Sequence, residues 1–281
     1  MTDRALELTA TWPVPTVAAA VVRRGEVLDS IGPSDHRFRL ASISKPITTW
    51  AVLIAVEEGI VTLDDPVGPD DGSGRTLRHL LAHAGGYGFD SPRPIVRPER
   101  KRIYSNTGIE IAADHVASAA GMDIATYLRL GVFEPLEMPN SELRGSAAHG
   151  VWSTVADLVR FVGEVSTPTL ITAASAADVR RLHYPGLGGI VPGVGRFDNC
   201  PWGLGFEIRG SKAPHWTGSA NSTDTFGHFG GSGTLMWIDP QADDLALVAL
   251  TDRSFDQWSV EALQRWPEIS DAALAEFAGA R

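Results

Sequence analysis

The sequence predicts a mixed α/β (α+β) fold: an antiparallel sheet built from both chain ends and flanked by helices, with an inserted all-helical subdomain. Strand patterns occur near the N-terminus and return after about residue 200, whereas amphipathic segments and Gly- and Pro-bearing loops fill the region between them. We therefore predict a discontinuous α/β subdomain, residues 1–60 and 183–281, and a helical subdomain, residues 61–182. The cleft between two such units is a common place for a small-molecule site.

The predicted strands are short apolar runs bounded by turn residues. The first two flank Arg23-Arg24-Gly25 and predict a β-hairpin, and the others follow the Gly- and Pro-rich loop at 185–195. The predicted strands are residues 17–22, 27–31, 204–209, 225–229, 234–238 and 245–250.

Helices are predicted between the two groups of strands and at the C-terminus. The first begins at or just after Ser42, because Pro46 is tolerated in a first turn and residues 47–56 are apolar and unbroken; it ends at Gly59. The remaining predicted helices are residues 77–83, 108–120, 124–130, 156–165 and 260–277, the last with a break near Pro267.

Composition limits the function. With 43% hydrophobic and 21% charged residues, the 281-residue chain is typical of a core-forming globular protein. A net charge of -10 argues against a nucleic-acid partner, and the basic cluster at 97–102, interrupted by Pro98 and Glu99, is interpreted as a solvated loop. The lone Cys200 permits no intramolecular disulfide. An acidic start and the lack of a long apolar run predict a cytoplasmic protein with no membrane partner.

The string Ser42-Ile43-Ser44-Lys45 is a candidate nucleophile and base. A hydroxyl needs a neighbouring group to remove its proton, and the Ser-x-x-Lys spacing stacks both side chains on one face of a helix. The chain has only three lysines, and a desolvated ammonium loses its proton where a guanidinium would keep it. A solvated lysine on the helix surface is the alternative.

A second string, Tyr104-Ser105-Asn106, lies just before a predicted helix. A phenol can shuttle a proton if neighbouring cations lower its pKa, and an amide can bind a substrate carbonyl while fixing the lysine. Alternatively, Asn106 caps the helix and Tyr104 packs on its edge.

The third string, His228-Phe229-Gly230-Gly231, ends a predicted strand, where small residues let backbone N–H groups approach a ligand. The N–H groups of Ser42 and Gly231 would hold an oxyanion, with His228 and Gly230 beside them. A structural histidine followed by a connecting turn is the alternative. No Gly-Lys-Ser or Gly-Lys-Thr follows the glycines, so a phosphate loop is not predicted.

No metal or cofactor is predicted. His79 and His83 stand four apart on a predicted helix, but the glutamate of a His-Glu-x-x-His zinc site is missing. The Gly-x-Ser-x-Gly string of α/β-hydrolases does not occur either. The expected partner is a small-molecule substrate, and the sequence leaves the oligomeric state open.

In this order and with these gaps, the three strings resemble serine hydrolases related to class C β-lactamases, D-alanyl-D-alanine carboxypeptidases, D-aminopeptidases and family VIII-type esterases, whose fold is that of β-lactamases and penicillin-binding proteins. The likeness covers most of the chain. It extends to Leu80-Leu81-Ala82-His83-Ala84-Gly85-Gly86, Trp152-Ser153-Thr154-Val155-Ala156-Asp157-Leu158 and Pro201-Trp202-Gly203-Leu204-Gly205-Phe206.

The resemblance implies roles for the matched residues. Ser42 would be the nucleophile and Lys45 its base or proton relay. Tyr104 would be the base for the leaving group or incoming water, with Asn106 as an orienting partner. β-Lactamases usually have lysine at the position of His228, while the peptidases and esterases of this family often have histidine.

Phe229 departs from the family pattern, which commonly has Thr or Ser there to hold a substrate carboxylate. Because phenylalanine cannot donate that hydrogen bond, we expect a serine hydrolase that prefers small esters over carboxylate-bearing β-lactams and D-amino-acid peptides. The alternatives are a β-lactamase or D-alanyl/D-amino peptidase, and a non-catalytic ligand-binding descendant of the fold.

Overall fold

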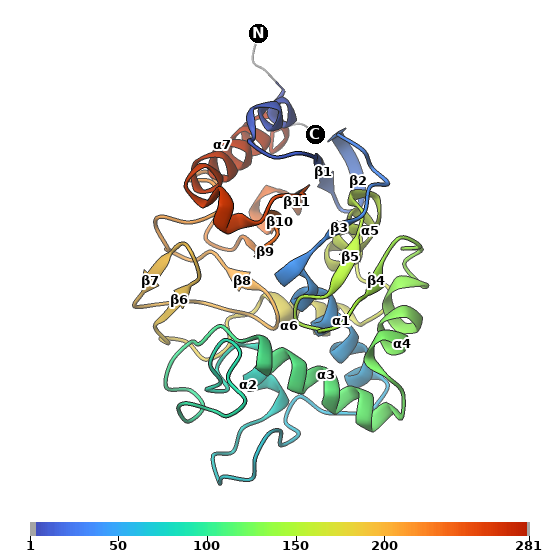
Figure 1. Cartoon of the computed structure of the whole chain (residues 1–281), viewed down its shortest axis with the longest axis vertical. Helices are drawn as coiled ribbons and strands as arrows, with labels where there is room; N and C mark the ends of the chain where they lie inside the picture. The colour runs from blue at the N-terminus through green and yellow to red at the C-terminus, as the bar shows by residue number, and fades with distance from the viewer. Residues whose placement is uncertain (1–3, 280–281) are drawn as a thin grey trace.

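The computed structural model describes residues 4–279 and is built around a six-stranded antiparallel sheet (Figure 1). The strand order is β2-β1-β11-β10-β9-β8, so the N-terminal hairpin pairs with the last strand of the chain. The strands are β1 (Val17–Arg23), β2 (Glu26–Ile31), β8 (Glu207–Ile208), β9 (Phe226–Gly230), β10 (Thr234–Asp239) and β11 (Leu245–Thr251). The predicted fold class, a sheet assembled from both chain ends, is confirmed.

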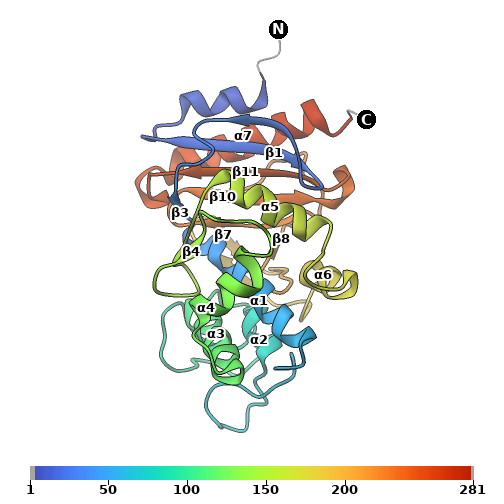
Figure 2. The same ribbon diagram turned by 90° about the vertical axis from the view of Figure 1, so that its right-hand side faces the viewer.

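The two faces of the sheet belong to different apolar cores because successive side chains of a strand point to opposite faces. Along β1, Ala18 and Ala20 join one core, whereas Ala19 and Val21 join the other. Helix α7 (Ser259–Phe277) and the 3₁₀ helix Ala5–Thr11 cover one face, and α5 (Val155–Ser166) packs on the other (Figure 2).

The remaining helices lie beyond α5, on the same side of the sheet (Figure 2). They are α1 (Ser44–Glu57), α2 (Leu77–Leu81), α3 (Asn106–Ala120), α4 (Ile124–Leu128), continued by a π-helical turn, and α6 (Ala173–Arg180). Helix α1 packs against α3, whereas α5, from the predicted helical insertion, packs on β1 and β11. The subdomain limits at 61 and 182 stay a prediction.

Within residues 4–279, no helix has both the length and the apolar composition to cross a bilayer.

Several short strands were not predicted. β3 (Phe38–Arg39), β5 (Val151–Ser153) and β4 (Glu142–Leu143) form a small three-stranded sheet, and β4 and β5 lie inside the region predicted to be helical. β6 (Gly189–Val191) and β7 (Gly195–Phe197) form a hairpin where the sequence predicted a loop. Strands of two or three residues are too short to show a period-two pattern, which explains both errors.

The predicted break at Pro267 is also wrong, because α7 continues through it. A proline inside a helix removes one backbone hydrogen bond and favours a kink. Buried side chains on both sides of Pro267, including Trp266 and Ile269, pack on the sheet and hold the two halves in one element. Tertiary packing therefore outweighs the local cost.

Candidate active site

Ser42 lies on a single 3₁₀ turn, Ala41–Ile43, that leads into α1. The preceding Ala41 has a φ of 47°, in the left-handed region that costs an L residue energy and that is often found beside functional groups. The surrounding strands hold this turn through Leu40: its carbonyl accepts a hydrogen bond from Thr234 Oγ1 at 2.9 Å, and its N–H donates to the Val151 carbonyl.

Gly230 lets β9 come close to the same turn. A Cβ atom at this position would lie 2.2 Å from the Leu40 carbonyl oxygen and 2.4 Å from Thr234 Oγ1, so only glycine fits. The close backbone approach expected of the third string is therefore made by Gly230. Next to it, Gly231 faces open space, since a Cβ there would contact no atom within 4 Å.

Lys45 is fully buried, and its Nζ lies 3.2 Å from Ser42 Oγ. The amine also donates to Asn106 Oδ1 at 2.7 Å and to the Ala148 carbonyl at 3.1 Å. A neutral amine has two N–H groups and one lone pair; with both N–H groups engaged by these acceptors, the lone pair is left for the hydroxyl of Ser42. The alternative of a solvated lysine is excluded.

Burial lowers the pKa of Lys45 from 10.5 to about 7, against the opposing effect of the Glu110 and Asp90 carboxylates. Among residues 4–279, no carboxylate forms an ion pair with the amine. A large fraction of Lys45 is therefore neutral near pH 7, as a general base requires.

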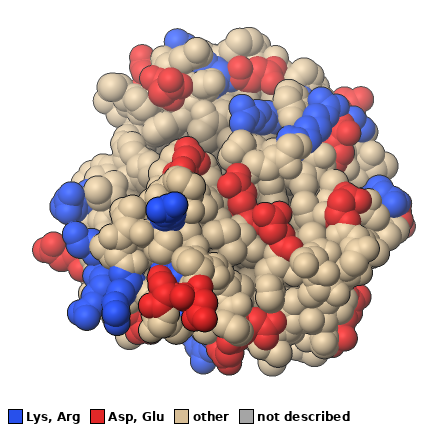
Figure 3. All heavy atoms as spheres, turned by 60° about the horizontal axis from the view of Figure 1, so that its bottom comes forward, with Lys and Arg blue, Asp and Glu red and all other residues tan. Residues whose placement is uncertain are grey.

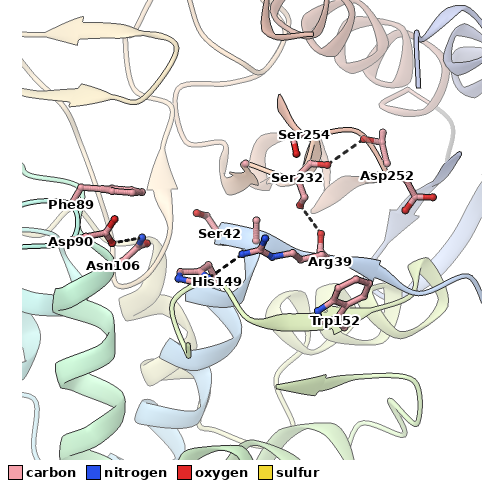
Figure 4. Close-up of a pocket in the computed structure, with 13 residues that line it drawn as sticks. Arg39, Ser42, Phe89, Asp90, Asn106, His149, Trp152, Ser232, Asp252 and Ser254 are labelled. Atoms are coloured by element: carbon pink, nitrogen blue, oxygen red, sulfur yellow. Dashed lines mark hydrogen bonds between the residues drawn. The ribbon is translucent and has the colours of Figure 1, made fainter. Parts of the chain in front are cut away.

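Ser105, not Asn106, caps α3: its Oγ accepts a hydrogen bond from the Gly108 N–H at 3.0 Å. Asn106 is free for the amine, and its Nδ2 donates to Asp90 Oδ1 at 2.9 Å (Figure 4). Asp90 thereby fixes the amide so that its oxygen faces Lys45. The cap interpretation of Asn106 is wrong, and Asp90 is a residue of the site that the sequence did not reveal.

The ring of Tyr104 lies beside the amine, with Lys45 Nζ 4.6 Å from its centroid. Desolvation raises the pKa of Tyr104, although a hydrogen bond with Ser42 acts in the opposite direction. The condition for a proton shuttle, a phenol pKa lowered by neighbouring cations, is therefore not met. The phenol stays protonated and can donate a proton rather than remove one.

His228 is buried and neutral. Burial, assisted by the charge of Lys45, lowers its pKa to about 3. Its Nδ1–H donates to the Phe229 carbonyl at 2.6 Å, and its Nε2 has no partner among residues 4–279. The ring lies 5.6 Å from the rings of both Tyr104 and Trp202, centroid to centroid.

Ser42 opens onto two cavities. The first, of about 490 Å³, is named here the polar cavity because its lining includes Arg39, Asp90, His149 and Asp252 (Figure 4). The second, of about 390 Å³, is named the aromatic cavity, and its lining includes Tyr104, Trp202, Phe229 and Phe255. Both linings include Ser42, Phe89 and Gly231, so the two cavities meet at the candidate nucleophile.

Comparison with known proteins identifies the family. The sequence matches the family model described as Beta-lactamase over residues 7–267, which is most of the chain. The chain belongs to the beta-lactamase family. The predicted relationship to β-lactamases and penicillin-binding proteins is confirmed.

Individual relatives agree with this placement. A crystal structure described as a beta-lactamase from Mycobacterium bovis is 48% identical, with a TM-score of 0.93 over 98% of this chain and 99% of that one. Penicillin-binding protein 4* of Bacillus subtilis (strain 168) is 30% identical over 133 residues, 36% of this chain and only 29% of that protein. EstCE1, described as a hydrolase with promiscuous acyltransferase activity, shares the fold at 18% identity, with a TM-score of 0.77 over 96% of both chains.

Phe229, the departure from the pattern of the beta-lactamase family, packs in an aromatic cluster. Its ring centroid lies 5.7 Å from Trp216, 5.3 Å from Phe255 and 5.7 Å from Trp266. The two hydroxyls nearest in sequence do not replace the missing threonine: Thr225 Oγ1 donates to Asp239, and Ser232 Oγ donates to the Arg39 carbonyl.

The two histidines weighed as metal ligands have separate structural roles. His79 accepts a hydrogen bond from the Thr76 N–H at the start of α2 and contacts Glu99 at 3.0 Å. His83 accepts from the Ser105 N–H and packs edge-on against Trp202. Among residues 4–279, no three His, Cys, Asp or Glu side chains are grouped so that they could hold a metal.

Proposed function

We propose that this member of the beta-lactamase family is a serine hydrolase that forms an acyl-enzyme at Ser42 and prefers small esters. Amides and β-lactams would be poorer substrates. One observation carries the proposal: a buried amine, with both of its N–H groups engaged, lies 3.2 Å from the hydroxyl of Ser42. A non-catalytic descendant of the fold would have no need to keep a lysine buried without a counter-ion.

In the proposed acylation, Ser42 Oγ bonds to the substrate carbonyl carbon while its proton passes to Lys45. The N–H groups of Ser42 and Gly231 would stabilise the oxyanion, and losing one such donor costs about a hundred- to a thousandfold in rate. When the carbon–oxygen bond to the leaving group breaks, Tyr104 gives its proton to the departing oxygen and regains one from Lys45. Water then repeats these steps and releases the acid.

The preference for esters rests on Phe229. At position 229, a carboxylate next to the scissile bond, as in penicillins, would meet an aromatic ring in place of a hydroxyl donor. One hydrogen bond left unmade costs about 1–3 kcal/mol. EstCE1, which shares the fold, is described as a hydrolase with promiscuous acyltransferase activity, and this is consistent with acyl transfer on the fold.

A β-lactamase or D-amino peptidase is the second candidate. The 48% identical structure from Mycobacterium bovis, described as a beta-lactamase, favours it. Specificity constants for a chromogenic cephalosporin, a D-alanyl amide and a nitrophenyl ester separate the candidates. We expect the ester to have the highest kcat/KM.

Labelling tests the acyl-enzyme directly. Native protein and a Ser42→Ala variant are treated with a fluorescent fluorophosphonate and a fluorescent penicillin, with an active relative as a positive control. We expect the fluorophosphonate to label native protein at Ser42 and to spare the variant. If neither reagent labels native protein while the relative reacts, the proposed function is wrong.

Replacing Phe229 tests the substrate preference. Phe229→Thr restores a hydroxyl and is expected to raise the ratio of cephalosporin to ester turnover about tenfold. Phe229→Leu is the control, because it also opens space in the aromatic cluster but supplies no donor. An unchanged ratio in the Thr variant, or the same change in the Leu variant, would refute this role of Phe229.

A further inference from the structure

A third cavity, of about 770 Å³, neighbours the aromatic cavity and is named here the outer groove. The two share Phe89, Tyr104 and Pro192 in their linings, and the aromatic cavity reaches Ser42. A substrate that filled the aromatic cavity and extended beyond it would therefore enter the outer groove.

The walls of the outer groove expose large apolar side chains. Phe89 is 51% exposed, Ile95 is 61% exposed and Ile190 is 49% exposed. Isolated exposed apolar residues are ordinary on soluble proteins, but three around one groove that shares lining residues with a cavity at Ser42 indicate contact with an apolar ligand segment.

The same groove carries cations without partners. Arg100, Lys101 and Arg196 are exposed, line the groove and form no hydrogen bond or ion pair through their side chains with any residue in 4–279. Among the described residues of the lining, Asp198 is the sole acidic one. In the sequence, Arg100 and Lys101 belong to the basic cluster at 97–102, for which a solvated loop is the simplest interpretation.

This concentration of positive charge stands out in a chain with a net charge of -10. On the face shown in Figure 3, acidic side chains are spread from the middle to the edges, and basic side chains form separate groups among them. Arg102, the neighbour of Lys101, is different: its buried guanidinium donates to backbone carbonyls, including those of His183 and Cys200. Arg100, Lys101 and Arg196 have no such structural role.

We propose that the outer groove binds the far end of the acyl group, and that this end carries an anionic group such as a carboxylate. The apolar part of the acyl chain would lie over Phe89 and Ile190, and the anion would meet the three cations. This inference rests on the proposed function and specifies its substrate class: an ester that is uncharged around the scissile bond and anionic at the end of its acyl chain. It is compatible with Phe229, which acts near the scissile bond.

The test uses p-nitrophenyl esters of straight-chain acids, in pairs of equal length that end in a carboxylate or in a methyl group. In native protein we expect kcat/KM to favour the carboxylate at one range of chain lengths, by about tenfold at low salt and less at high salt. In an Arg100→Gln/Lys101→Gln/Arg196→Gln variant, the ratio within each pair should fall to about one. Because the ratio is internal to each preparation, a partly unfolded sample does not imitate this result.

Arg93→Gln is the matched control, since Arg93 is exposed on the neighbouring loop but does not line the outer groove. The Arg93→Gln variant should keep the native preference for the carboxylate-ended ester. The absence of a preference at every length, or a preference that survives in the triple variant, would overturn the proposal.

Binding to a Ser42→Ala variant separates this proposal from the proposed function. Calorimetry with the monomethyl ester of a straight-chain dicarboxylic acid measures groove binding without turnover. If native protein is not labelled at Ser42 but the variant binds this ester through the three cations, the proposed function is wrong and the groove proposal is supported. If native protein is labelled at Ser42 but the variant does not bind this ester, the proposed function is supported and the groove proposal is wrong.

Discussion

Two of the three lysines in this chain are buried, and their surroundings differ in one decisive respect. Lys45 donates to an amide oxygen and a backbone carbonyl, both neutral. Lys212 lies 3.1 Å from the carboxylate of Glu207, which also accepts from Trp216 Nε1 at 2.8 Å and contacts His215 at 3.2 Å. Burial alone therefore does not make a lysine a base. A buried lysine becomes one when its partners are neutral, because a carboxylate partner stabilises the protonated amine.

The effect of pairing is visible in Glu207. Burial acts to raise the pKa of this carboxyl, but the charge of Lys212 and hydrogen bonds from His215 and Trp216 hold it well below its usual range. The Lys212–Glu207 pair is a structural unit of two charges. The unpaired Lys45 can change its charge near neutral pH, which is what proton transfer requires.

Replacing Lys45 should have the largest effect on the reactivity of Ser42. Lys45→Met removes the base, and we expect fluorophosphonate labelling of Ser42 to slow by about a hundred- to ten-thousandfold. Lys45→Arg should be equally impaired, because a guanidinium keeps its proton. Rapid labelling in either variant would show that Ser42 does not depend on a neutral amine at position 45.

Lys212→Met should instead cost stability. It leaves the Glu207 carboxylate buried without its counter-ion, and we expect the free energy of unfolding to fall by about 3–5 kcal/mol. Folded protein should still be labelled at Ser42. Thermal unfolding of this variant and of a Glu207→Gln/Lys212→Met double variant, which removes both charges and should recover part of the loss, measures the effect. A single variant as stable as native protein would contradict the structural role of the pair.

Replacing either acidic neighbour of Lys45 should change kcat/KM less, and in a way that distinguishes Asp90 from Glu110. Asp90 and Glu110 both raise the pKa of Lys45, so Asp90→Asn and Glu110→Gln should each move the rise of kcat/KM with pH to lower pH. Asp90 also accepts a hydrogen bond from Asn106, and asparagine would keep an acceptor oxygen there. Asp90→Ala, which removes the acceptor, should therefore lower the rate at high pH by about tenfold for one hydrogen bond, whereas Glu110→Gln should not. Equal high-pH rates in the Asp90→Ala and Glu110→Gln variants would show that the hydrogen bond from Asn106 to Asp90 does not support catalysis.

The sequence predicted the parts of this site that depend on local spacing. Ser42 and Lys45 are three residues apart at the start of a helix, so their contact follows from helix geometry. The ends of β1 and β9 were placed within a residue or two because both strands are apolar and bounded by turns. The joint order of the three strings indicated the family, which the comparisons confirmed.

The rest depends on contacts between distant segments, which no local pattern encodes. The Ala148 carbonyl that accepts from Lys45 belongs to a loop whose sequence carries no signal for it. Asp90 looks like a loop carboxylate until the fold brings it to Asn106. The pKa of Tyr104 rises because tertiary packing desolvates the phenol, which a count of neighbouring cations in the sequence does not reveal.

The pH dependence of Ser42 labelling tests the central claim most directly. Because the reactive form has a neutral Lys45, the second-order rate constant for the fluorophosphonate should be low below pH 6, rise with one ionisation near pH 7 and then level off. A rate constant that keeps rising toward pH 10, the ordinary range of a lysine, or one that does not change with pH, would contradict the account.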